Sequence, residues 1–172
     1  MVAAAAPVPG HVLATRRFGA ETVLVTRIAG PSAFCPRGYL LAALKNRKVV
    51  ARRSIRPTFF TGALCGTRFR WLAVGRFVSV DIVDTASIGE EAQVYRLRGG
   101  HFRLIHVFGA DRIRTGAGGA FVLTWITAAR SPRAHVREVW RWRNGRFRLV
   151  NSRGLTTSGF LRGGWPVGFY LR

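Results

Sequence analysis

The chain has 172 residues, 48% of them hydrophobic, and its 28 Lys and Arg outnumber seven Asp and Glu to give a net charge of +21. This length suits one domain with its own core, and the apolar content excludes a disordered chain. No apolar run approaches the roughly 20 residues that cross a bilayer as a helix, so no transmembrane segment is predicted. The excess of bases predicts an anionic partner, either nucleic acid, anionic lipid or acidic polysaccharide. A compositional bias toward Arg is the alternative explanation.

The first ten residues predict a flexible leader or the remnant of a signal peptide. They hold an Ala-rich stretch and a Pro-containing spacer but no basic residue. The two cysteines, Cys35 and Cys65, fit one disulfide in an exported protein, or two thiols in a cytoplasmic one. We expect the Cys35–Cys65 bond and an extracytoplasmic or secreted location, with a cytoplasmic location as the alternative.

One sequence pattern typical of a β-hairpin occurs twice in the chain. Residues 94–105 and 139–150 share seven of twelve positions, and each alternates around a Gly-Gly or Asn-Gly pair. Such a pair between alternating strands is typical of a two-residue β-turn. A weaker copy spans 41–51 with Asn46-Arg47 as its turn. The alternation predicts these facing pairs: Leu44 with Val49, Lys45 with Lys48, Leu97 with Phe102, Arg98 with His101, Arg96 with Arg103, Trp142 with Phe147, Arg143 with Arg146, and Arg141 with Arg148.

An apolar strand precedes each hairpin, at residues 22–28, 77–83 and 121–126. The resulting units, about 22–55, 77–108 and 120–153, recur at the spacing of β-propeller blades. The segment 154–172 is a partial fourth unit, which the strand around 12–18 could complete. We therefore expect residues 11–172 to form a single all-β domain of repeated antiparallel strand and hairpin units. It is β-propeller-like, with a β-sandwich or an open barrel as the alternative.

The stretch 71–83, followed by the hairpin 94–105, resembles an FG-GAP or VCBS-type propeller repeat. In that family an Ala-x-Gly-Asp-Phe-like strand leads through an acidic calcium loop to an Asp-Ile-Val strand. The resemblance covers about residues 70–150 and implies a propeller-like fold with an extracytoplasmic binding role. The Asp-x-Asp-Gly loop is missing, since Arg76 and Val78 stand where acids are expected and only Asp81 remains. Calcium is not implied, because it needs several oxygen ligands in one loop.

No catalytic or metal-binding motif is present. The four histidines lack metal-ligand spacing, no Gly-x-Ser-x-Gly occurs, and the adjacent Glu90 and Glu91 are expected to point apart and neutralise nearby Arg. We predict a non-enzymatic protein that needs no cofactor, and the sequence sets no oligomeric state. An enzyme with a site assembled across repeats, lined by Glu90, Asp111 or Glu138, stays open as an alternative.

The strongest candidate for a binding site is a cationic face shared by the hairpins. Directly opposed like charges destabilise a hairpin, so repeating them suggests an anionic ligand. The alternative is a solvated face whose Arg stems cover apolar surface. The expected ligand is an anionic polymer such as acidic cell-envelope glycan, with sequence-nonspecific nucleic-acid binding as the alternative. The face comprises Lys45, Lys48, Arg96, Arg98, His101, Arg103, Arg141, Arg143, Arg146 and Arg148, and the matching interior positions are Leu44, Val49, Leu97, Phe102, Trp142 and Phe147.

Overall fold

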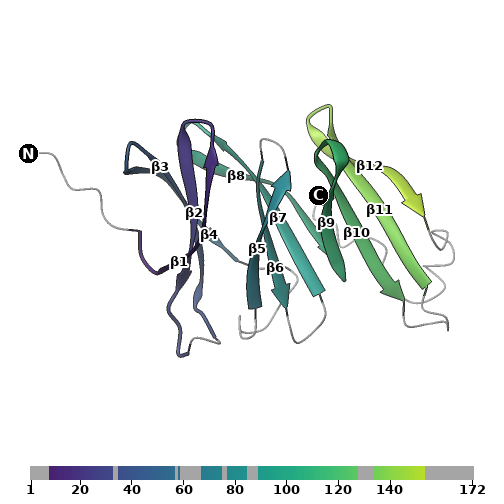
Figure 1. Ribbon diagram of the computed structural model, residues 1–172, viewed down its shortest axis with the longest axis horizontal. Coiled ribbons are helices and arrows are strands. Elements are labelled where there is room, and N and C mark those ends of the chain that lie inside the picture. Colours follow the sequence, from purple (N-terminus) through teal and green to yellow (C-terminus); the bar gives the residue numbers. More distant parts are fainter. Residues whose placement is uncertain are drawn as a thin grey trace, which may run out of the picture.

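The structure is a computed structural model that describes residues 8–32, 35–56, 58, 67–74, 77–84, 89–127 and 134–153. Within these ranges the chain forms three four-stranded antiparallel sheets, which follow one another along the sequence and stack face to face (Figure 1). The predicted all-β fold of repeated antiparallel units is confirmed. Successive four-stranded sheets packed in chain order are also how neighbouring propeller blades are arranged.

In each sheet, strands adjacent in the chain are adjacent in space. The first sheet contains β1 (His11–Phe18), β2 (Glu21–Ile28), β3 (Gly38–Lys45) and β4 (Lys48–Ile55). The middle sheet contains β5 (Thr67–Val74), β6 (Phe77–Asp84), β7 (Gly89–Arg98) and β8 (His101–Ala110). The third sheet contains β9 (Arg112–Gly116), β10 (Ala120–Thr127), β11 (Ala134–Arg143) and β12 (Arg146–Arg153), and a short 3-10 turn, η1 (Ala117–Gly119), joins β9 to β10.

The last two strands of each sheet form the predicted hairpins. Both turn residues have positive φ in all three: 51° and 63° at 46–47, 56° and 71° at 99–100, and 48° and 82° at 144–145. This is the type I′ geometry that matches the twist of the flanking strands. All eight facing pairs predicted from the alternation are present in the strand register. The middle turn also lies against the first sheet, since a Cβ at Gly100 would stand 3.0 Å from the Val50 carbonyl oxygen.

Each predicted repeat unit corresponds to the last three strands of one sheet. Strands β1, β5 and β9 supply the fourth strand in each case. The strand predicted around 12–18 is β1, the edge strand of the first sheet, where it pairs with β2. That it also completes a fourth unit stays a prediction. The rest of that fourth unit, 154–172, lies outside the described residues.

Two hydrophobic cores separate the three sheets. The first joins the first and middle sheets and includes Val25, Leu41, Val80 and Tyr95. The second joins the middle and third sheets through a cluster of rings. The middle sheet is therefore buried on both faces, and this explains why β6 is buried without a break from 77 to 82.

A β-bulge redirects the side chains of β8. Leu104 faces Tyr95 but His106 faces Val94, so Ile105 is an extra residue in the strand. Because a bulge moves the following residues to the other face, Phe102 lies in the first core and Phe108 in the second. The hairpin of the third sheet has its register shift at the corresponding place, between 139 and 140. The sequence repeat thus includes the bulge as well as the turn.

None of the six residues predicted to lie inside is exposed. Phe102 and Phe147 are buried, while Leu97 and Trp142 are partly buried and pack against the first and second cores. Leu44 and Val49 are half-buried. They belong to neither core, because Ala43 points into the first core and its neighbour Leu44 points to the opposite face.

Candidate anion-binding face

The outer face of the third sheet carries four of the predicted arginines. Trp142 and Phe147 pack into the second core, so the alternating residues of β11 and β12 point away from it. Arg141 pairs with Arg148, and Arg143 with Arg146. All four arginines are exposed.

Two further arginines, Arg112 of β9 and Arg137 of β11, extend this face. Both pair with Thr124 of the central strand β10, so the three form one row across the sheet. Their neighbours Ile113 and Leu123 point into the second core, which directs the row outward. Sequence reasoning missed Arg112 because it did not recognise β9 as a strand, and it missed Arg137 because this residue precedes the repeated segment 139–150. We name the whole set the arginine face: Arg112, Arg137, Arg141, Arg143, Arg146 and Arg148.

Acidic groups do not neutralise the arginine face in the described part of the chain. Its six guanidinium groups make none of the ion pairs found there, which join Arg70 and Arg114 to Asp81 and Glu90. Glu138 lies on β11 between arginines, but its Oε2 accepts a hydrogen bond from Trp140 Nε1 at 2.9 Å, and Trp140 packs against the second core. The face therefore presents positive charge to solvent across three strands.

The predicted cationic residues of the middle hairpin have a different environment. Arg96 is half-buried, and its guanidinium carbon lies 5.8 Å from the ring centroid of Phe77 and 5.2 Å from that of Trp142. These are cation–π distances, so Arg96 contributes to the contact between the middle and third sheets. Arg98, His101 and Arg103 are exposed near the hairpin turn.

The structure does not bring the first hairpin to this face. Lys45 and Lys48 pair as predicted and are exposed, but they lie at the turn of the first sheet. The middle sheet separates that sheet from the arginine face (Figure 1). They are thus not neighbours of the other predicted site residues.

Cys35 follows a turn in which its backbone N–H donates to the Ser32 carbonyl oxygen, and it is disulfide-bonded. Its predicted partner, Cys65, lies outside the described residues. The Cys35–Cys65 pairing therefore stays a prediction.

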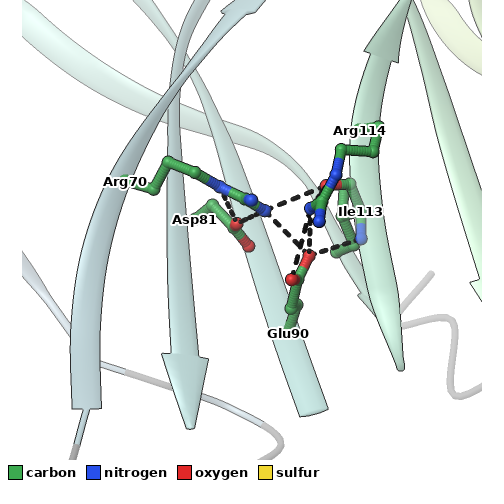
Figure 2. A network of polar contacts seen from close by, with 5 residues as sticks. All are labelled: Arg70, Asp81, Glu90, Ile113 and Arg114. Carbon is green, nitrogen blue, oxygen red and sulfur yellow. Dashed lines mark hydrogen bonds and ion pairs between the residues drawn. The ribbon is translucent and has the colours of Figure 1, made fainter. Parts of the chain in front are cut away.

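An ion cluster with two buried carboxylates, Asp81 and Glu90, joins the middle and third sheets (Figure 2). Arg70 of β5 donates from Nε to Asp81 Oδ2 at 2.8 Å, and from Nη2 to Glu90 Oε2 at 2.8 Å and to the Ile113 carbonyl oxygen at 2.9 Å. Glu90 also accepts from the Ile113 N–H and, at 3.3 Å, from Arg114 Nη1. The expectation that Glu90 neutralises nearby Arg is confirmed.

Glu91 points to the opposite side of β7. It accepts hydrogen bonds from Thr58 and Gln93 between the first and middle sheets. The adjacent carboxylates point apart, as expected. Two cavities, one lined by Arg53, Gln93 and Tyr95 and the other by Arg16, Phe18 and Leu97, include none of the acids of the enzyme alternative.

Burial raises the pKa of Asp81 from 3.8 to about 7, although the Arg70 guanidinium lowers it. Between these values the folded chain retains a proton that the unfolded chain has released, so the free energy of unfolding falls as pH rises from about 4 to 7. We expect Asp81→Asn to flatten this fall. The upper limit of the effect is about 4 kcal/mol, since each tenfold change in proton affinity is worth about 1.4 kcal/mol.

The measurement is urea unfolding of both proteins at closely spaced pH values. Burial lowers the pKa of His106, which adds a pH dependence of opposite sign, but this histidine is present in both proteins and cancels in the comparison. Parallel stability profiles for the wild type and Asp81→Asn would show that Asp81 does not titrate in this range.

Comparison with known proteins does not identify the chain: no family model, curated protein or solved structure matches it. Among the described residues no helix is long and apolar enough to cross a membrane. The same residues contain no group of three or more His, Cys, Asp or Glu side chains that could hold a metal ion. The arginine face, with six exposed guanidinium groups on one sheet, is the candidate site.

Proposed function

We propose that the protein is a non-enzymatic binding module whose arginine face holds an anionic polymer. The observation that carries this proposal is six exposed arginines on one sheet face with no carboxylate partner in the described chain. Arginines directly opposite each other on neighbouring strands destabilise a sheet. A ligand with repeated negative charges offsets that cost.

The spacing of a sheet suits a polymer. Arginines two residues apart on one strand stand about 7 Å apart, and those on neighbouring strands about 5 Å apart. Planar guanidinium groups bind carboxylate, phosphate or sulfate through paired hydrogen bonds. Trp140, Trp142 and Phe147 pack with the second core, which removes them as stacking platforms for bases. This arrangement favours contact with the charged groups of a polymer and no reading of bases.

An acidic cell-envelope glycan is the ligand class that we favour. The disulfide at Cys35 supports an extracytoplasmic location, because disulfides persist in oxidising compartments. The resemblance to FG-GAP or VCBS repeats also implies such a role. Nucleic acid, bound through its phosphates, is the alternative that the binding experiment separates.

The test compares two variants that each lose four positive charges. The face variant replaces Arg141, Arg143, Arg146 and Arg148 by Gln. The control variant replaces four exposed residues of the first sheet by Gln, namely Arg17, Lys45, Arg47 and Lys48. Affinities for polygalacturonate and for a DNA duplex are measured over a series of salt concentrations.

We expect the face variant to bind at least tenfold more weakly than the control variant. For DNA, the slope of log K against log salt should decrease by up to about 4, since each lost phosphate contact contributes about 0.9. The unfolding free energy of the face variant should stay the same or rise, because two opposed pairs are removed. Equal losses in the two variants would mean that total charge, and not the arginine face, binds the polymer.

A further inference from the structure

A second basic site lies between the first and middle sheets, away from the arginine face. A cavity of about 490 Å³ is lined by Arg52, Arg53 and Arg56 together with Ser54, Thr58 and Leu104. This volume is within the range of pockets for small molecules. The cavity lies beside β4 and β8, which meet at the boundary of the two sheets (Figure 1).

Buried polar side chains form the wall of this cavity on β7. Gln93 and Tyr95 line it, and both are buried. The Tyr95 hydroxyl donates to Gln93 Oε1. The Arg53 guanidinium acts on this hydroxyl and lowers its pKa. Burial raises the pKa of Tyr95 to about 12, so its hydroxyl keeps the proton that it donates to Gln93.

Further hydrogen bonds join residues 56 and 58, which follow β4, to side chains of β7. Gln93 Nε2 donates to the Arg56 carbonyl oxygen at 2.6 Å and to Glu91 Oε1 at 2.6 Å. Glu91 accepts from the Thr58 backbone N–H at 2.7 Å and from Thr58 Oγ1 at 2.9 Å. The backbone at 56 and 58 is thereby fixed before any ligand binds, which reduces the ordering cost of binding.

We propose that this cavity binds a small phosphate ester, with the phosphoryl oxygens at the guanidinium groups and the organic part against Leu104. Arg53 and Arg56 line the cavity together with the hydroxyl side chains of Ser54 and Thr58, and no carboxylate is among the described residues that line it. A dianion is the charge that several guanidinium groups match best. The site is separate from the arginine face and does not depend on the proposed function.

The test uses the full chain with glucose 6-phosphate as the probe. Binding is measured by calorimetry and by the rise in the melting temperature of the protein. Glucose and glucuronate are the neutral and carboxylate controls. We expect glucose 6-phosphate to bind in the micromolar to millimolar range and glucose not to bind. The variant Arg53→Gln/Arg56→Gln should bind at least tenfold more weakly, while Arg17→Gln/Arg47→Gln, which loses the same charge at a distance, should bind like the wild type.

Two further variants test whether the probe binds in the cavity and not at the arginine face. Leu104 is 37% exposed, so Leu104→Trp can occlude the cavity without entering a core, and it should abolish binding even if the double arginine variant does not fold. The face variant defined above should keep its affinity for glucose 6-phosphate. The proposal is overturned if the wild type does not bind the probe, if Leu104→Trp binds it normally, or if glucuronate binds as tightly.

Discussion

Replacing Phe108 by Ala is expected to lower the free energy of unfolding by about 3–5 kcal/mol, the usual cost of deleting a buried aromatic ring. Phe108 is 0% exposed in the second core. Its ring centroid lies 4.7 Å from that of Phe121, 5.3 Å from that of Phe147 and 5.8 Å from that of Trp140. Phe108 is in the middle sheet and these three are in the third, so the cavity would open in the contact between sheets.

Urea unfolding provides the measurement, with an unchanged m-value as evidence that the folded and unfolded states keep their exposed areas. Leu149→Ala is the matched control. Leu149 lies on β12 of the third sheet but is 45% exposed, so its truncation should change stability by no more than about 0.5 kcal/mol. Similar losses for the two variants would mean that the aromatic contacts do not hold the sheets together.

The hairpins were the part of the fold most open to prediction. Their turns need residues that accept positive φ, and Gly99-Gly100 and Asn144-Gly145 are such pairs. Period-two alternation then sets the register, as in the pairs Leu97–Phe102 and Trp142–Phe147. Both signals are local, which is why one sequence was enough.

The first strand of the third sheet was harder to predict than β1, which matches the strand expected around 12–18. Strand β9 has five residues with a single large apolar side chain, Ile113, between two arginines. The turn after it contains η1, so no two-residue hairpin signal marks it. The bulge at Ile105 was also missed, because strict alternation places Phe102 and Phe108 on one face. Their placement on opposite faces becomes visible only in the packing between sheets, where Phe102 lies in the first core and Phe108 in the second.

The arginine residues show why the repeat alone could not define the site. Arg96 and Arg141 occupy corresponding positions of the two hairpins. Arg96 belongs to the middle sheet and lies over the ring of Trp142, whereas Arg141 belongs to the outer face of an end sheet. The position of a sheet in the stack therefore decides whether a repeated arginine stabilises the fold or stays available to a ligand.

Glu90→Gln is expected to lower the free energy of unfolding by roughly 2–4 kcal/mol, somewhat below the usual cost of breaking a buried ion pair because Arg70 is partly exposed. Glu90 is 8% exposed and accepts from Arg70, Arg114 and the Ile113 N–H. An amide in its place turns one acceptor into a donor among donors. Urea unfolding is the measurement, and Glu21→Gln on the first sheet, half-buried, is the control, expected within about 0.5 kcal/mol of the wild type.

The same variant has a second expected effect, on the titration of Asp81. The negative charge of Glu90 is one of the causes that raise the pKa of Asp81, so removing it should lower that pKa below about 7. The fall in stability with rising pH should then end at a lower pH than in the wild type. Loss of stability without this displacement would mean that Glu90 acts only through its hydrogen bonds to Arg70 and to β9. The opposite result is a pH dependence that shifts as expected while the loss of unfolding free energy is no larger than in Glu21→Gln. It would mean that the charge of Glu90 acts on Asp81 but that its hydrogen bonds do not hold the two sheets together.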